Sequence, residues 1–169
     1  MRVYCAELGG KSGSEAVYAL LDHAYQAEHN RSLPEIEKTP LGKPYFPEHP
    51  DIHFSLSHTR THVLCALADS PVGCDIESPR KISSSAMRFF CTPEELALFE
   101  PLELWVLKES FVKLFGWTVA SIRRLRFSRD GETIIAPDSS VTARIYQVAG
   151  CTAAVCGTSK MSCTSIELV

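Results

Sequence analysis

The sequence lacks a long apolar run and a strong charge bias of either sign. Charged residues make up 22% of the 169 residues, and they interrupt each apolar segment before the roughly 20 residues that a membrane-spanning helix needs. The first residues lack the basic segment and apolar core of a secretory signal. A net charge of -3 gives no general attraction to nucleic acid. We therefore expect a cytoplasmic protein with no membrane and no nucleic-acid partner.

Motifs of paired cysteines are also absent. The seven cysteines form no CxxC pair, and their spacing to histidines does not suit zinc. Their odd number and their apolar, strand-like surroundings argue against a disulfide framework. We expect reduced and mostly buried thiols at Cys5, Cys65, Cys74, Cys91, Cys151, Cys156 and Cys163.

Apolar periodicity predicts an α+β protein. Three- and four-residue spacing predicts helices at about 14–29 with Ser14 as N-cap, at 86–90, from Thr92, and at 101–116. The proline-rich segment 30–50 is expected to be a long loop. Short apolar or alternating runs predict strands at 2–8, 52–56, 62–68, 72–77, 125–128, 133–136, 142–148, 152–156 and 165–168. The order of these elements suggests two α+β lobes.

The predicted helix over 101–116 carries one charge pattern that needs an explanation. Glu109 and Lys113 are i,i+4 neighbours on one face, and a broad apolar stripe supports them. An ordinary amphipathic helix with one surface ion pair would also produce this pattern. The helix alone therefore does not establish a site.

Asp75 and Glu77 form a second charged pattern on the predicted strand 72–77. Because side chains alternate along a strand, both carboxylates point to the same face. They could converge on one cation, or they could lie in solvent and pair with Arg80 or Arg88. Two carboxylates alone leave both explanations open.

Glu109 could complete an oxygen-ligand set with the two strand carboxylates. Three carboxylates suit Mg²⁺, which usually completes its octahedron with substrate phosphates and water. Such a set predicts a ligand that carries phosphate, with nearby cations to balance its charge. The candidates are Lys43, His58, Lys108 and Lys113. Three of them have a simpler explanation as well: Lys43 could be a solvated loop lysine, His58 could end the hairpin, and Lys108 could be a surface residue.

Five short motifs occur in a fixed order: GKPYF (42–46), FSLSHT (54–59), VGCDIE (72–77), RFF (88–90) and WVLKESFVK (105–113). Together they resemble the 4'-phosphopantetheinyl transferase superfamily, and its surfactin-type subgroup most closely. The resemblance implies transfer of the phosphopantetheine arm of coenzyme A to a serine of an apo acyl- or peptidyl-carrier protein. The second product would be 3',5'-adenosine bisphosphate.

The same resemblance implies a fold of two similar α/β lobes, a pseudo-dimer with the site in the cleft between them. We expect the lobes to meet near Ser70, with 1–70 as the N-terminal lobe and 71–169 as the C-terminal lobe of one catalytic unit. Members with both lobes in one chain act as monomers, so we expect a monomer here.

Roles for single residues also follow from the resemblance. Asp75, Glu77 and Glu109 match the Mg²⁺ ligands of the family, with Mn²⁺ as a possible substitute. Glu109 also matches the proposed general base for the carrier serine, acting directly or through water. Lys113 matches the lysine on the pyrophosphate of coenzyme A, and Lys108 is its neighbour in the motif.

The remaining matches concern the nucleotide end of coenzyme A. Lys43, Ser57 and His58 match residues that contact the adenosine and the 3'-phosphate, and Pro44 helps to shape the adjoining loop. The pattern departs from the family between Lys11 and Arg31, where this chain has no lysine or arginine. Contacts that longer members make to the 3'-phosphate have no match there.

Two alternatives and one surface complete the expectations. A non-catalytic homologue that binds coenzyme A or a carrier protein is the main alternative, and a metal-dependent phosphohydrolase is a weaker one. Carrier proteins are typically acidic, so a basic and aromatic patch would suit docking. The candidate patch consists of Arg80, Lys81, Met87, Arg88, Phe89 and Phe90, and a helix that packs its aromatic residues inward is its alternative.

Overall fold

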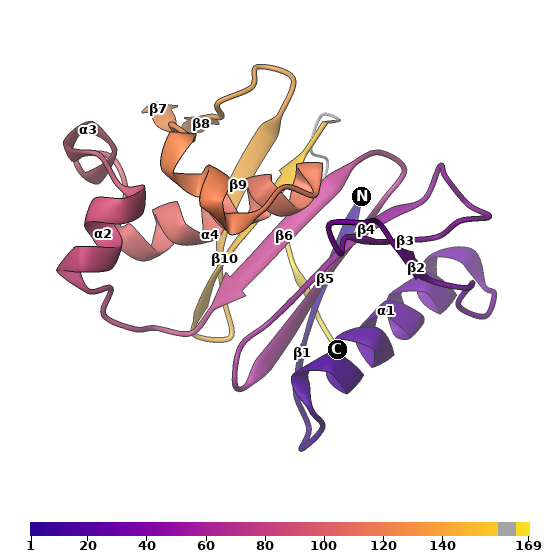
Figure 1. The fold of residues 1–169 in the computed structure, drawn as a ribbon. Coiled ribbons are helices and arrows are strands. Elements are labelled where there is room, and N and C mark those ends of the chain that lie inside the picture. Colours follow the sequence, from indigo (N-terminus) through magenta and orange to yellow (C-terminus); the bar gives the residue numbers. More distant parts are fainter. Residues whose placement is uncertain (159–164) are drawn as a thin grey trace.

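The computed structural model of this protein describes residues 1–158 and 165–169. Two main sheets lie side by side, and a long helix packs on the outer face of each (Figure 1). Two short two-stranded ladders complete the described structure. The α+β class predicted from the sequence is confirmed.

The first half contributes the helix α1 and three strands of a four-stranded sheet in the order β11-β1-β5-β4, whose fourth strand, β11 (Glu167–Leu168), comes from the end of the chain. β5 runs antiparallel to both β1 and β4. A small ladder of β2 and β3 lies inside the segment that we expected to be a loop. The bounds are β1 Arg2–Glu7, α1 Gly13–His29, β2 Glu37–Lys38, β3 Pro44–Tyr45, β4 His53–His58 and β5 His62–Ala68.

The predicted N-cap of α1 is wrong by two residues. Ser12 caps the helix: its hydroxyl accepts from the backbone N–H of Glu15, and the Glu15 carboxylate accepts from the Ser12 N–H. This is a capping box, in which two N–H groups at the helix start find acceptors at once. Ser14 therefore lies in the first turn instead of before it.

The second half contributes the antiparallel sheet β6-β10-β9 and most of the helices. Residues 119–124 form a 3-10 helix, so the strand predicted at 125–128 begins only at Ser128. The bounds are β6 Val72–Glu77, α2 Ser84–Phe90, α3 Pro93–Leu96, α4 Pro101–Phe115, η1 Val119–Arg124, β7 Ser128–Asp130, β8 Thr133–Ile135, β9 Thr142–Val148 and β10 Cys151–Gly157. The last strand, β11 Glu167–Leu168, pairs in parallel with β1 of the first sheet.

Alternation along the strands divides the core into three layers. One cluster lies between α1 and the first sheet, and another lies between α4 and the second sheet. The middle cluster joins the sheet faces that point away from both helices, and it contains Cys74 and Ile76 of β6. Asp75, between those two residues, therefore points toward α4, as the strand alternation predicts.

Both halves share one connectivity. In each, a first strand leads to a helical segment and then to a hairpin whose second strand pairs antiparallel with the first strand. Two similar lobes would have this connectivity, but β11 crosses into the first sheet. The boundary near Ser70 and the equivalence of the lobes stay predictions.

Buried thiols are a common feature of the core. The six cysteines in the described ranges are free, and all but the half-buried Cys91 are buried; Cys163 lies outside these ranges. Burial raises the pKa of Cys74 to about 11 and that of Cys156 to about 12. Within the described part of the chain, the prediction of reduced, buried thiols is confirmed.

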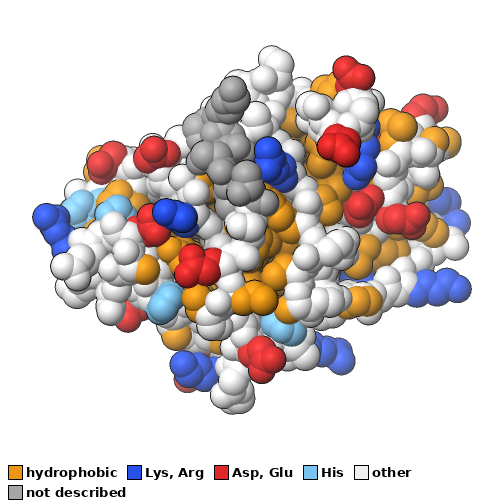
Figure 2. Space-filling view, turned by 180° about the vertical axis from the view of Figure 1, so that it is seen from behind, with side chains coloured by type: hydrophobic (Ala, Val, Ile, Leu, Met, Phe, Trp, Pro, Cys, Tyr) orange, Lys and Arg blue, Asp and Glu red, His pale blue; other side chains and the backbone are white. Residues whose placement is uncertain are grey.

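Charges of both signs are mixed on the rear face of the molecule (Figure 2). Seen from behind, lysine, arginine, aspartate and glutamate side chains are interspersed around a largely apolar centre, and neither sign forms a broad field (Figure 2). None of the helices in the described ranges is both long and apolar enough to cross a bilayer.

Candidate functional site

The carboxylate of Asp75 is the centre of the candidate site. Its Oδ1 accepts hydrogen bonds from Lys113 Nζ and from Ser57 Oγ, each over 2.7 Å. Its Oδ2 is buried and has no hydrogen-bond partner among the described residues. A buried carboxylate oxygen without a donor is unfavourable by about 1–3 kcal/mol or more. This oxygen is therefore suited to receive a cation or another donor.

Gly73 allows α4 to approach Asp75. A Cβ atom at Gly73 would lie 2.0 Å from the Ser110 carbonyl oxygen and 2.4 Å from the Leu114 nitrogen, both in the backbone of α4. Only glycine fits there without moving the helix. The close contact places Lys113, in the last turn of α4, within ion-pair distance of Asp75.

Lys113 is the cation of this site. Its side chain is 31% exposed, and its amine also donates to the Leu56 carbonyl over 3.4 Å. Burial lowers the pKa of Lys113, but the negative charge of Asp75, with help from Cys74 and Glu109, outweighs it and holds the pKa above its ordinary value. The amine is therefore cationic at neutral pH.

Glu109 lies one helical turn before Lys113 and is half-buried. Burial raises its pKa above the ordinary value, Asp75 adds to the shift, and Lys113 opposes it. A raised pKa makes a carboxylate a better proton acceptor near neutral pH. The repulsion between Glu109 and Asp75 would be relieved by a cation bound between them.

Glu77 is held by other partners. Its Oε1 accepts from Trp105 Nε1 over 3.0 Å and from Arg80 over 3.1 Å, and its Oε2 accepts from Arg80 over 3.3 Å. Pairing with Arg80 was the alternative that the sequence left open for this carboxylate. Trp105, one turn before Glu109, was expected to contribute only to the apolar stripe of the helix, and its hydrogen bond to Glu77 was not predicted.

A ready-made site of three carboxylates is not found. Across residues 1–158 and 165–169, no group of three or more His, Cys, Asp or Glu side chains is placed to hold a metal ion. Asp75 Oδ2, which is buried and accepts no hydrogen bond, and the half-buried Glu109 nevertheless fit a cation that prefers oxygen ligands, such as Mg²⁺. Glu77 could join them only by leaving Arg80 and Trp105.

A cavity of about 360 Å³ adjoins this site, between α1, the segment 38–44, β4 and the end of α4. Four of the predicted residues line it: Lys43, Pro44, His58 and Lys113. The exposed ring of His58 packs against the start of α1, where a Cβ at Gly13 would lie 2.6 Å from it. Ser14 and Tyr18 of α1 also line this cavity, and the sequence analysis missed them because their proximity to β4 arises only in the fold.

Lys43 and Ser57 bind groups of the protein itself. The Lys43 amine donates to the Leu114 carbonyl over 2.6 Å and to the Val72 carbonyl over 3.4 Å, and burial lowers its pKa. The Ser57 hydroxyl is buried against Asp75. Both residues therefore act at this site at least as structural links.

Comparison with known proteins identifies the family of this chain. The sequence model described as "4'-phosphopantetheinyl transferase superfamily" matches residues 71–158. This chain belongs to that superfamily. The matched segment contains Asp75, Glu77, Glu109 and Lys113, whereas Lys43, Pro44 and His58 come before it.

Curated relatives of this superfamily member are bacterial. It is 33% identical over 141 residues to 4'-phosphopantetheinyl transferase Sfp of Bacillus subtilis (strain 168). The aligned segment covers 75% of this chain and 62% of the relative. It is 36% identical over 133 residues to 4'-phosphopantetheinyl transferase psf-1 of Bacillus pumilus, over 66% of this chain and 57% of the relative. The predicted resemblance to the surfactin-type subgroup is confirmed, and the chain spans only about 60% of the length of these relatives.

Lys108 of this superfamily member does not fit the predicted phosphate role. Its side chain is fully buried and pairs with Glu95 over 2.8 Å. The amine also donates to the carbonyls of Phe90 and Leu125, over 2.5 and 3.0 Å. With three acceptors inside the core, Lys108 joins α2, α3, α4 and the end of η1, and we correct its role to a structural one.

The predicted docking patch is only partly at the surface. Phe90 is buried, whereas Arg88 is exposed and Phe89 is 47% exposed. Arg80 stays close to the site, paired with Glu77 and 5.8 Å from the centre of the Trp105 ring. The helix thus packs one of its two phenylalanines inward, and the docking role of the rest stays a prediction.

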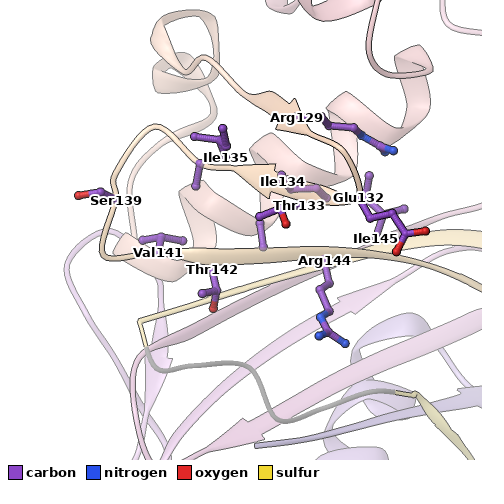
Figure 3. A pocket seen from close by; sticks show the side chains of 12 residues that line it. Arg129, Glu132, Thr133, Ile134, Ile135, Ser139, Val141, Thr142, Arg144 and Ile145 are labelled. Atoms are coloured by element: carbon purple, nitrogen blue, oxygen red, sulfur yellow. The ribbon is translucent and has the colours of Figure 1, made fainter.

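A larger cavity of about 830 Å³ lies between β8 and β9. The guanidinium groups of Arg129 and Arg144 point away from the space between these strands (Figure 3), and Arg129 lies over the Phe99 ring at 4.5 Å. With its cations turned away and an otherwise mostly apolar lining, this cavity does not suit phosphate. The smaller cavity beside Lys113 remains the candidate.

Proposed function

We propose that this protein transfers the 4'-phosphopantetheine arm of coenzyme A to a serine of an apo acyl- or peptidyl-carrier protein. The products are the holo-carrier protein and 3',5'-adenosine bisphosphate. One observation carries the proposal: in a member of this superfamily, Asp75, Glu109 and Lys113 meet beside a cavity that His58 and Lys43 also line. Membership alone would leave a non-catalytic relative as plausible as an enzyme.

Each residue has a distinct part in the proposed reaction. Lys113 binds the pyrophosphate of coenzyme A, because its cationic amine lies where the cavity meets Asp75. Glu109 accepts the proton of the carrier serine, directly or through water, as the serine oxygen attacks the β-phosphorus. The bond between that phosphorus and the oxygen of the adenosine bisphosphate breaks, and the bisphosphate leaves.

The proposed cation is Mg²⁺, with Mn²⁺ as a substitute. Asp75 Oδ2 and Glu109 would hold it, joined by Glu77 if that carboxylate releases Arg80. When bound, the ion would stabilise negative charge on the pyrophosphate and on the departing bisphosphate.

The nucleotide end of coenzyme A would occupy the 360 Å³ cavity. His58, at its rim, would contact the 3'-phosphate, with Lys43 and Pro44 beside the adenosine. Ser14 and Tyr18 of α1 line the same cavity.

The decisive experiment combines the protein, Mg²⁺, coenzyme A and a purified apo carrier protein. We expect a phosphopantetheine adduct on the carrier by mass spectrometry. Glu109→Gln and Asp75→Asn should each lower kcat/KM about a hundredfold or more, since each removes a group that meets the reacting atoms or the ion. Lys81→Ala, at an exposed position of the predicted docking patch, is the control for docking. Excess carrier protein should restore the transfer rate of this variant, whereas it should not restore the rate of Glu109→Gln or Asp75→Asn.

A folded protein that forms no adduct with several unrelated carriers would refute the proposal. Binding of coenzyme A by the same sample, measured by calorimetry, would then favour the non-catalytic homologue. The proposed site lies within one chain, so we also expect a monomer in sedimentation experiments.

A further inference from the structure

β4 and β6 are joined by two serine hydroxyls. These strands belong to different sheets yet lie side by side. Ser55 Oγ accepts from the backbone N–H of Cys74 over 3.0 Å, and Ser57 Oγ accepts from the N–H of Ile76 over 3.3 Å. Both serines are buried, so this joint is shielded from water. The pattern FSLSH places the two hydroxyls two residues apart on one face of β4.

Only one of the two serines also reaches the candidate site. A serine hydroxyl has one proton and two lone pairs. At Ser57 the Ile76 N–H occupies a lone pair and the proton points to Asp75 Oδ1 over 2.7 Å. Ser55 lies close to the same strand, but its hydroxyl is bonded to the backbone of Cys74 and not to Asp75.

The two donors on Asp75 Oδ1 determine what its other oxygen can do. Ser57 and Lys113 both bind Oδ1, so Oδ2 is left buried and without a donor. Lys113 reaches Asp75 through a long, flexible side chain, whereas Ser57 is fixed by strand packing and by the Ile76 N–H. Ser57 is therefore the partner that fixes the rotation of the carboxylate about its Cβ–Cγ bond.

We infer that Ser57 is a positioning residue for the cation: it holds Asp75 so that Oδ2 faces the ion, an inference that rests on the proposed function. Ser57 thus acts through Asp75. Partners of metal-binding carboxylates in other proteins change metal affinity about 10- to 100-fold when they are removed. The same range is expected here.

The test measures Mn²⁺ binding by electron paramagnetic resonance, with and without coenzyme A, on wild-type protein and on Ser57→Ala, Ser57→Thr and Ser55→Ala. Ser57→Ala should raise the Mn²⁺ dissociation constant about 10- to 100-fold. Ser57→Thr keeps a hydroxyl and should restore most of the affinity. Ser55→Ala removes the other half of the β4–β6 joint but keeps the hydrogen bonds of Asp75, so its Mn²⁺ affinity without coenzyme A should stay close to that of the wild type; Ser55 lines the cavity proposed for the nucleotide, so this control is compared without coenzyme A.

Denaturant unfolding of the same four proteins separates positioning from folding. Equal loss of Mn²⁺ affinity in Ser57→Ala and Ser55→Ala would overturn the inference, because the joint alone would then explain the loss. Unchanged affinity in Ser57→Ala, or no Mn²⁺ binding by the wild type in either condition, would overturn it as well. The inference can fail in these ways while the carrier adduct still forms, so the two proposals are tested separately.

Discussion

The two halves of the molecule share a connectivity but differ in what lies between helix and sheet. α1 packs on the first sheet through an apolar face of Ala16, Val17, Leu20, Leu21, Ala24 and Tyr25. α4 packs on the second sheet with Ser110 buried against β10 and Lys113 turned toward β6, and it buries Lys108 on its other side. The comparison teaches that the same architecture can exclude charge in one half and organise it in the other.

The difference begins with the absence of a side chain at one position of β6. Gly73 brings the backbone of α4 against the strand, and Asp75, two residues later, meets the helix face that carries Glu109 and Lys113. Between α1 and the first sheet, side chains such as Leu21 and Cys65 fill the space. A site can form only where the packing leaves room for polar groups.

The largest effect on stability is expected from Lys108→Met, which removes a charge that has no counterpart in the first half. Glu95 would be left buried without its cation, a change that typically lowers the free energy of unfolding by about 3–5 kcal/mol. Denaturant unfolding measures this loss. The double variant Lys108→Met/Glu95→Gln should recover much of it, and a single variant as stable as wild type would contradict the structural role.

Gly73→Ala should lower the free energy of unfolding by about 1–3 kcal/mol, because overpacking forces α4 away from β6. Gly157→Ala is the matched control in the same sheet, since its added Cβ would lie 3.7 Å from the nearest atom, the Pro71 carbonyl oxygen, which is an ordinary contact. Gly73→Ala should also lower transfer activity by separating Lys113 from Asp75. Equal stability of the two variants would show that the close approach is not needed.

The smallest effect is expected from pH acting on the buried thiols of both halves. An unfolded cysteine loses its proton near pH 9, whereas Cys156 in the folded protein keeps it until about pH 12. The unfolded state therefore binds fewer protons above pH 9, and stability falls as pH rises.

Between pH 8 and pH 10 the loss should be about 1 kcal/mol for each such thiol. Comparing the pH dependence of unfolding in wild type and Cys156→Ala isolates this contribution. Identical slopes for the two proteins would mean that the thiol ionises as readily in the folded state as in the unfolded chain.

Local patterns predicted several strands well. The predicted limits of 62–68, 72–77 and 142–148 agree with β5, β6 and β9. The strand predicted at 52–56 instead runs to His58, so Ser57 and His58 lie inside β4. The start of α1 was misplaced because Ser12 and Ser14 are both good caps, and only the pairing of Ser12 with Glu15 decides between them.

The environment of the charges could not be predicted in this way. Lys108 and Lys113 are both lysines within the same predicted amphipathic helix. In the structure, Lys108 is enclosed by Glu95 and two backbone carbonyls, whereas Lys113 borders a cavity. That difference depends on the path of the chain after α2, which brings Glu95 over α4. Likewise, the hydrogen bonds that Trp105 and Arg80 donate to Glu77 depend on positions that follow from packing.

The Lys43 bridge has one more consequence, for the dimensions of the cavity. Its amine donates to the Leu114 carbonyl near the end of α4 and to the Val72 carbonyl at the start of β6. Its backbone belongs to the proline-rich segment, which forms another wall of the cavity. The length of one lysine side chain therefore sets the distance between that segment and the helix that carries Glu109 and Lys113. A ligand in the cavity therefore lies between two walls, the segment 38–44 and the end of α4, whose separation is limited by the Lys43 side chain.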